Sequence, residues 1–500
     1  MKPAFLLAPL LVSFTTGLLC IVYLRARPSV LKSISLIGAL LHLAATALIL
    51  LAVQKAEVIA IQLGGWQAPF GITVVVDYLS ALMLLITSVL YVAGVLFSFA
   101  EDMPSFFKPY FWALIHFLIM GVSGAFSTGD YFNLYVCYEI MIIASFGLMA
   151  ISQNRLTLEG TFKYALLNFL ASTLFLMGLG VLYGVVGSLN IADVTYKITT
   201  SDHSVWALSA ALLMSIGFSI KSALFPFYNW LPSSYHLPTF SASAIFAGLL
   251  TKVGLYSLFR LLLMTFQSHQ DIITPVFVFM ACMTMLLGVF GAATKFHMRK
   301  ILSFHIISQA GYIVLGVAFF TKAAVAAAIF YMAHHMIVKS NLFLISGAVK
   351  DITGHEDLSG TGRLLKSHPG LALAFVISGF SLGGIPPLSG FFAKLGILRE
   401  GIHIQSYGVV FIGLFVGILT LYSMVKIWAE VFWKEAVEKN INHKKIPFMM
   451  WVPIILLCCV TLFLSFYPSS LMSFSNKASA LLLDPSTYIR TVLPVKSEAP

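Results

Sequence analysis

The feature that most constrains this chain is a succession of apolar runs, each about as long as a membrane-spanning helix. A bilayer-spanning helix needs about 20 apolar residues, and such runs follow one another along most of the 500 residues. Hydrophobic residues make up 59% of the sequence and charged residues 10%, whereas a soluble domain has about 45–50% and about 25%. These values exclude a soluble enzyme, a disulfide scaffold and a disordered chain. They predict an all-α integral membrane protein.

Fourteen candidate spans are bounded by charges, prolines or glycines. They cover residues 4–24, 33–53, 71–98, 109–127, 131–152, 161–186, 205–228, 240–266, 272–294, 301–320, 323–348, 369–398, 406–429 and 447–468. The first run lacks a small-residue cleavage site, so we interpret it as a span rather than a signal peptide. The last thirty residues are expected to form a polar tail. The five cysteines show no metal-ligand spacing, and the sequence predicts neither a metal site nor a cofactor.

The distribution of lysine and arginine predicts the orientation in the membrane. With the N-terminus outside, 17 of these residues lie in inner loops and helix ends and 8 lie on the outer side. Because inner loops carry the excess of basic residues, both termini are predicted to lie outside, with an even number of spans.

A few charged residues remain inside the predicted spans. They are one glutamate and four lysines: Glu139, Lys221, Lys252, Lys339 and Lys394. Unpaired at the bilayer centre, they would together cost on the order of 12–18 kcal/mol, so they must pair, face water or lose their charge. Structural ion pairs are the plain alternative, but titratable groups spread over five helices favour a proton path.

Histidines and other polar residues extend this set. His334 and His335 lie in span 11, and His335 shares a helix face with Lys339 four residues later. The spacing also places His305, Ser308 and Gln309 where they could lengthen a hydrogen-bonded wire. His236 and Asp77 lie nearer the span boundaries, where a structural role is as plausible, and Arg260 is expected to extend to the membrane interface.

Two spans contain helix breakers beside a buried lysine. Pro226 follows Lys221, and Pro386 and Pro387 precede Lys394 by about two turns. Proline leaves backbone carbonyls unpaired, and at membrane depth this is tolerated only against protein or water. The second break should free the carbonyls of Leu382 and Gly383 beside Lys394. Two broken helices five spans apart indicate an inverted repeat of five helices.

At these residues the sequence resembles the antiporter-like, proton-translocating subunits of respiratory complex I and of the Mrp (Mnh) multisubunit Na⁺/H⁺ antiporters. The resemblance extends over spans 3 to 13. The matching segments are Glu139, 221–232, 252–256, 299–303 and 384–391. Lys394 stands where the M-type subunit of complex I has glutamate, and 244–252 looks like the D-type subunit of the Mrp system, which is the most similar type.

The resemblance implies fourteen spans, with spans 4–8 (109–266) and 9–13 (267–430) as inverted repeats between an N-terminal segment (1–108) and a C-terminal segment (431–500). It implies a proton path through Glu139, Lys221, Lys252, a span-11 histidine and Lys394. It also implies a transporter subunit, not an enzyme, in a cell-membrane complex with partners of A, B, C, E, F and G type that exchanges Na⁺ for H⁺.

Three alternatives stay open. A respiratory or hydrogenase-linked proton-pumping subunit would have the same fold, a stand-alone transporter would use the aromatic residues as a pocket, and a scaffold would leave the buried charges unexplained. Because Glu139 is the only carboxylate deep in a span and Na⁺ prefers several oxygen ligands, Na⁺ is expected to cross mainly elsewhere in the complex or to share this path transiently. The sequence does not decide which span-11 histidine relays protons.

Overall fold

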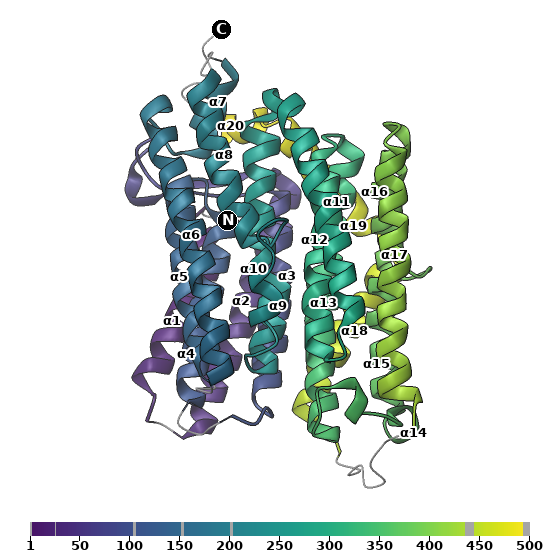
Figure 1. The fold of residues 1–500 in the computed structure, drawn as a ribbon. Helices are drawn as coiled ribbons and strands as arrows, with labels where there is room; N and C mark the ends of the chain where they lie inside the picture. The colour runs from purple at the N-terminus through teal and green to yellow at the C-terminus, as the bar shows by residue number, and fades with distance from the viewer. Residues whose placement is uncertain are drawn as a thin grey trace.

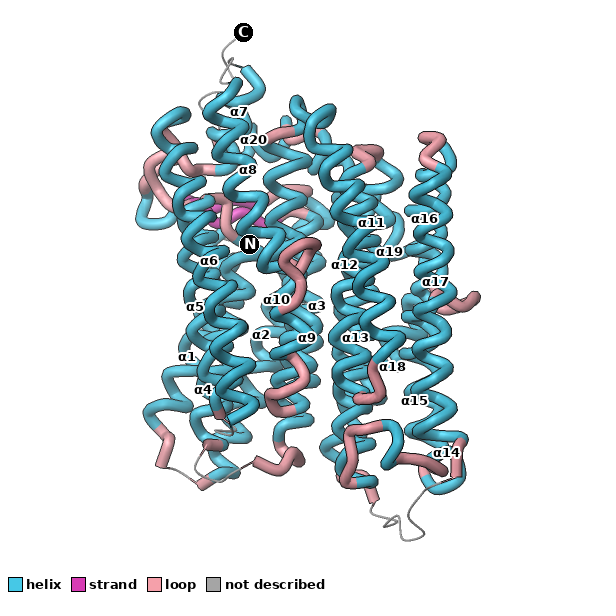
Figure 2. The backbone as a smooth tube through the Cα atoms, viewed as in Figure 1, coloured by secondary structure: helices cyan, strands magenta, loops and turns pink. Residues whose placement is uncertain are grey.

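The computed structural model describes residues 3–25, 27–103, 107–151, 155–200, 204–435 and 445–493. It is a bundle of long, roughly parallel helices, in which the earlier helices α1, α4, α5 and α6 lie on one side and α15, α16 and α17 on the other (Figure 1). Helices account for nearly all of the backbone, with one small sheet near one end (Figure 2). The predicted all-α membrane fold is confirmed.

Within the described residues, twelve helices are long and apolar enough to cross a membrane. Two shorter apolar helices, Val205–Lys221 and Pro369–Gly383, are the first parts of the predicted broken spans. The number fourteen therefore stays a prediction.

The N-terminal part contains η1 (Pro3–Leu7), α1 (Ala8–Val22), α2 (Pro28–Ala56) and α3 (Tyr78–Ser98). A two-stranded antiparallel sheet that the sequence analysis missed lies between α2 and α3: β1 (Ile59–Gln62) pairs with β2 (Thr73–Val76), with Ile59 opposite Val76.

The next part contains α4 (Lys108–Ser127), α5 (Tyr131–Ala150), α6 (Arg155–Val186), α7 (Ile191–Thr200), α8 (Ser204–Lys221), α9 (Trp230–Ser234), α10 (Phe240–Leu258) and the π-helical η3 (Phe259–Thr265). The third part contains η4 (Gln267–His269), α11 (Gln270–Thr294), α12 (Met298–Ala318), α13 (Lys322–Thr353), η5 (Leu358–Gly360), α14 (Leu364–Ser367), α15 (Pro369–Gly383), α16 (Ser389–His403), α17 (Tyr407–Trp428) and the π-helical η6 (Ala429–Trp433).

These two parts repeat the same order of features. Each has a 32-residue helix, α6 or α13, then a broken helix, α8/α9 or α15/α16, and then a long helix that ends in π-helical turns, α10/η3 or α17/η6. The recurrence supports the predicted five-helix repeats, whose boundaries at 109–266 and 267–430 stay a prediction.

The expected polar tail is wrong for the described residues. After α18 (Phe448–Phe466), the chain forms α19 (Pro468–Leu483) and α20 (Ser486–Val492); residues 494–500 lie outside the described residues. α19 packs against α13 and α3 with Leu471, Ser475 and Leu482 buried. Its buried residues are spaced as on one helix face, but it has only 16 residues and contains five serines, Asn476 and Lys477, so it is shorter and more polar than a span.

The two described ends of the chain lie at the same end of the molecule, because η1 and α20 both contact β1. This agrees with an even number of crossings. Which membrane face that end occupies stays a prediction.

Candidate functional site

The first buried lysine lies where a helix breaks. α8 ends at Lys221, whose Nζ donates to Ser172 Oγ at 3.2 Å and lies 4.5 Å from the centre of the Tyr138 ring. The break is held by a side chain, since Trp230 Nε1 donates to the Ile220 carbonyl at 3.0 Å. The same carbonyl also accepts from the Ala223 N–H at 3.0 Å, so the indole adds a second hydrogen bond at the helix end.

Glu139 lies on α5 next to Tyr138 and is the acidic group whose charge acts on Lys221. One of its carboxylate oxygens, Oε1, is buried without a hydrogen-bond partner. Among the described residues no ion pair within 4.0 Å joins it to a basic side chain. The pair is therefore electrostatically linked without direct contact.

Lys252 and Lys339 lie at the centre of the molecule, on packed helices α10 and α13. Lys252 Nζ donates to the Ala247 carbonyl at 2.6 Å, and Lys339 Nζ donates to the Leu302 carbonyl of α12 at 3.0 Å. Both side chains are buried. Carbonyls supply partial negative charge but no counter-ion, so each ammonium is only partly compensated.

The two adjacent histidines of α13 have different surroundings. Neither ring nitrogen of His335 has a hydrogen-bond partner among the described residues, and the charges acting on this ring include those of Lys252 and Lys339. His334 Nδ1 lies 2.9 Å from Ser389 Oγ, at the start of α16. His334 therefore contacts the second broken helix, whereas His335 lies one residue away without a hydrogen-bond partner among the described residues.

Lys394 occupies the place expected from the second break. Its Nζ donates to the carbonyls of Leu382 at 2.9 Å and Gly383 at 3.2 Å, and it lies 5.2 Å from the centre of the Tyr312 ring. The prediction that this break frees those two carbonyls beside Lys394 is confirmed.

The predicted extension of the wire is partly present. Gln309 accepts a hydrogen bond from Tyr331 and donates to Thr420 Oγ1 at 3.3 Å and to Ser308 Oγ at 3.4 Å. His305 is buried, and neither of its ring nitrogens has a hydrogen-bond partner among the described residues.

The prediction for Arg260 is wrong. Arg260 is only 3% exposed and binds Asp77 with both terminal nitrogens at 2.6 Å, instead of reaching the interface. Asp77 also caps α3 by accepting from the Ser80 N–H. A buried guanidinium needs such a two-point partner, so Asp77 has a structural role.

Sequence reasoning missed a second polar cluster, in the N-terminal helices. His42 of α2 bonds Ser88 and Ser123, at 2.9 and 3.0 Å, and His116 of α4 bonds Tyr91 and Ser35. The signal was available, because histidine is rare inside membrane spans. Every ring nitrogen in this cluster has a partner, unlike those of His335.

The comparisons with known proteins agree with this arrangement. Residues 128–420 match the family model "NADH:quinone oxidoreductase/Mrp antiporter, TM". The chain is 38% identical over 489 residues, covering 97% of this chain and 98% of the other, to the D-type Na⁺/H⁺ antiporter subunit of Alkalihalophilus pseudofirmus.

Solved structures show the same fold. A chain of the Mrp complex from Dietzia sp. superposes with a TM-score of 0.92 at 32% identity, covering 99% of this chain and 100% of that one. A chain of respiratory complex I from Thermus thermophilus gives 0.84 at 21% identity, covering 96% and 99%, and so shares the fold. With broken helices, buried lysines and full-length matches in agreement, the chain belongs to the NADH:quinone oxidoreductase/Mrp antiporter family of transmembrane subunits.

Proposed function

We propose that this chain is the D-type, proton-translocating subunit of a multisubunit Na⁺/H⁺ antiporter. The observation that carries the proposal is the set of buried lysines on α8, α10, α13 and α16. Among the described residues, none of the four has a carboxylate within 4.0 Å; each donates instead to a hydroxyl or to backbone carbonyls. Their charged and neutral forms are therefore closer in free energy than those of a lysine in water.

The geometry supports an order for the pathway. A proton reaching Glu139 weakens its attraction for Lys221, which then passes a proton towards Lys252. His335 continues the path to Lys339, and His334 connects α13 to Ser389 and to Lys394. In this proposal the two histidines have consecutive roles, and the contact between His334 and Ser389 supports the role of His334.

The proposal includes the cellular setting. The chain is a transporter subunit in the bacterial plasma membrane, with both termini outside, and it assembles with partners of A, B, C, E, F and G type. The support is the name of the 38% identical relative and the Mrp complex whose chain superposes over its whole length. The respiratory alternative rests on chains of two respiratory membrane complexes, at 26% and 21% identity, and is weaker than the match to the 38% identical relative.

The decisive experiment compares Glu139→Ala and Lys221→Ala in the purified whole complex, reconstituted into vesicles. Each change should abolish Na⁺-driven proton movement, because each removes one group of the linked pair, while subunit composition stays unchanged. Lys434→Ala, which removes an exposed lysine paired with Glu430, is the matched control and should retain exchange. Near-normal exchange in either pathway variant would refute the proposed route.

A further inference from the structure

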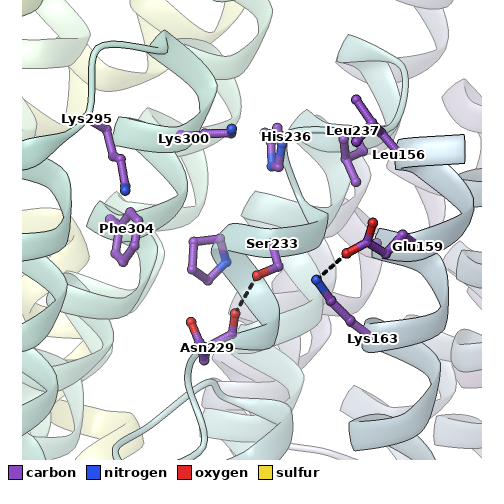
Figure 3. Close-up of a pocket in the computed structure, with 12 residues that line it drawn as sticks. Leu156, Glu159, Lys163, Asn229, Ser233, His236, Leu237, Lys295, Lys300 and Phe304 are labelled. Carbon is purple, nitrogen blue, oxygen red and sulfur yellow. Dashed lines mark hydrogen bonds and ion pairs between the residues drawn. The ribbon is translucent and has the colours of Figure 1, made fainter.

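A pocket of about 380 Å³ lies outside the proposed pathway. It is formed by the first turns of α6, by residues 229–237 around α9, and by the segment that leads into α12 (Figure 3). Both α6 and α12 begin beside it, at Arg155 and Met298. The pocket therefore lies at the level where helices leave the bilayer, on the side that the lysine and arginine count places inside.

The lining of the pocket has an excess of positive charge. Lys163 pairs with Glu159 at 2.6 Å, whereas Lys295 and Lys300 have no carboxylate within 4.0 Å among the described residues. Figure 3 shows Lys300 extending towards His236 across the pocket. Two lysine charges are thus left without a counter-ion in one concave site.

His236 contributes an uncharged polar group to the pocket. Its Nδ1 is buried without a hydrogen-bond partner. Burial, together with the charges of Lys300, His297 and Arg299, lowers the pKa of His236 to about 3. The ring is therefore neutral at physiological pH and can supply a polar contact without adding charge.

We propose that this pocket binds the phosphate of an anionic lipid headgroup from the inner leaflet. Lysines act as point charges for phosphate, and basic pockets between membrane helices on the cytoplasmic side bind anionic headgroups. A lipid fits better than a free anion because the rim is apolar: Leu156, which lines the pocket, is 69% exposed. On the same helix, Phe162 is 68% exposed and offers a surface for an acyl chain.

Because the pocket lies near the cavity of Lys221, a bound lipid could influence proton transport. Gly160 lines the pocket, and Tyr164, one turn further along α6, lines the cavity of Lys221. The rings of Tyr164, Trp230 and Tyr235 pack together between the two spaces, with centroids 5.3 to 6.4 Å apart. A bound phosphate would add negative charge on the other side of these rings from the cavity of Lys221. Any effect on transport rests on the proposed function, whereas binding does not.

Binding can be tested on the whole complex in phosphatidylcholine vesicles that contain a photoactivatable phosphatidylglycerol, with crosslinked peptides mapped by mass spectrometry. Crosslinks should concentrate on 156–163, 229–237 and 295–304. Lys295→Gln combined with Lys300→Gln should reduce them by about fivefold for each lysine removed. Lys366→Gln, an exposed lysine on α14, is the matched control and should leave them unchanged.

Unlabelled phosphatidylglycerol should displace the probe, and inorganic phosphate should not. Even labelling of all exposed helices, the same yield in the double variant, or displacement by inorganic phosphate would each overturn the lipid site. Co-purification of the partner subunits verifies that each variant is folded. The crosslinking result does not depend on transport, so failure of the lipid site and failure of the proposed function are distinguishable.

Discussion

The buried basic side chains of this chain differ in the groups that compensate their positive charge. Arg260, which stays charged, has both oxygens of Asp77, whereas Lys339 and Lys394 have only carbonyls. Composition and position were enough to predict which lysines are buried. They could not predict the partner of Arg260, because Asp77 is 183 residues away in the sequence and only the packing of α3 against the end of α10 brings them together.

Substitutions of Lys394 can test whether this side chain supplies only a positive charge or also releases a proton. Lys394→Arg keeps a positive charge but is effectively always protonated, so we expect it to assemble normally and to lose most exchange, as Lys394→Ala should. The measurement is Na⁺-driven proton movement from pH 7 to 9 in vesicles with the whole complex. Wild-type exchange in the arginine variant would show that this position supplies only a charge.

At the scale of elements, the two helix breaks could be predicted and the small elements could not. Prolines beside lysines mark the ends of α8 and α15, and both ends are where the pattern indicated. The β1–β2 pair, α7 and α19 were missed, since hydropathy over a span-length window does not detect four-residue strands, a 10-residue helix or a serine-rich helix with one buried face.

The second break depends on one close approach between α15 and α16. A Cβ on Gly390 would lie 1.9 Å from the Ser381 carbonyl oxygen and 3.0 Å from His334 Nε2. Gly390→Ala should therefore push α16 away, destabilise the fold by about 1–3 kcal/mol and strongly reduce exchange. Gly408→Ala, where a Cβ would meet nothing within 4 Å, is the matched control. Equal thermal stability and exchange in both variants would contradict this account.

Ion pairs of Glu356 with Arg299 and Lys350 stabilise the loop after α13. Burial alone would raise the pKa of Glu356, but Arg299, at 2.7 Å, and Lys350, at 3.1 Å, lower it below its usual value. The stabilisation is therefore present above the pKa of an unfolded glutamate, about 4.3, and is lost as the pH falls through the lower folded value.

Glu356→Gln should accordingly lower the free energy of unfolding by about 1.5–3 kcal/mol at pH 7, and the difference from wild type should shrink below about pH 4. Thermal unfolding of the purified complex at several pH values measures it. A difference that stays constant down to pH 3 would show that the carboxylate charge contributes nothing.

At the scale of the whole molecule, the order of helices repeats, but the described residues contain no carboxylate cluster for sodium. The recurring order of a 32-residue helix, a broken helix and a helix with π-helical turns agrees with the repeat that the sequence predicted. In contrast, no group of three or more His, Cys, Asp or Glu side chains that could hold a metal ion occurs among the described residues. The part described therefore contains the proposed proton route but no cluster of carboxylates that could bind sodium.

We therefore expect the isolated chain, reconstituted without partners, to show no Na⁺/H⁺ exchange, while the complete complex exchanges both ions. Sodium-driven quenching of a pH-sensitive dye in vesicles distinguishes the two preparations. Robust exchange by the isolated chain would mean that sodium crosses through this protein alone.

The carbonyl partners of the lysines have one further consequence. A peptide oxygen accepts hydrogen bonds and has no hydrogen to give, so it cannot hand a proton onward. Because an ammonium group has three N–H bonds, Lys252, Lys339 and Lys394 each keep at least one hydrogen outside these carbonyl contacts, and in the proposed pathway that hydrogen is the one passed on. In the proposed pathway, each transfer therefore requires the flexible lysine side chain to turn that N–H bond towards the next acceptor while a carbonyl holds another.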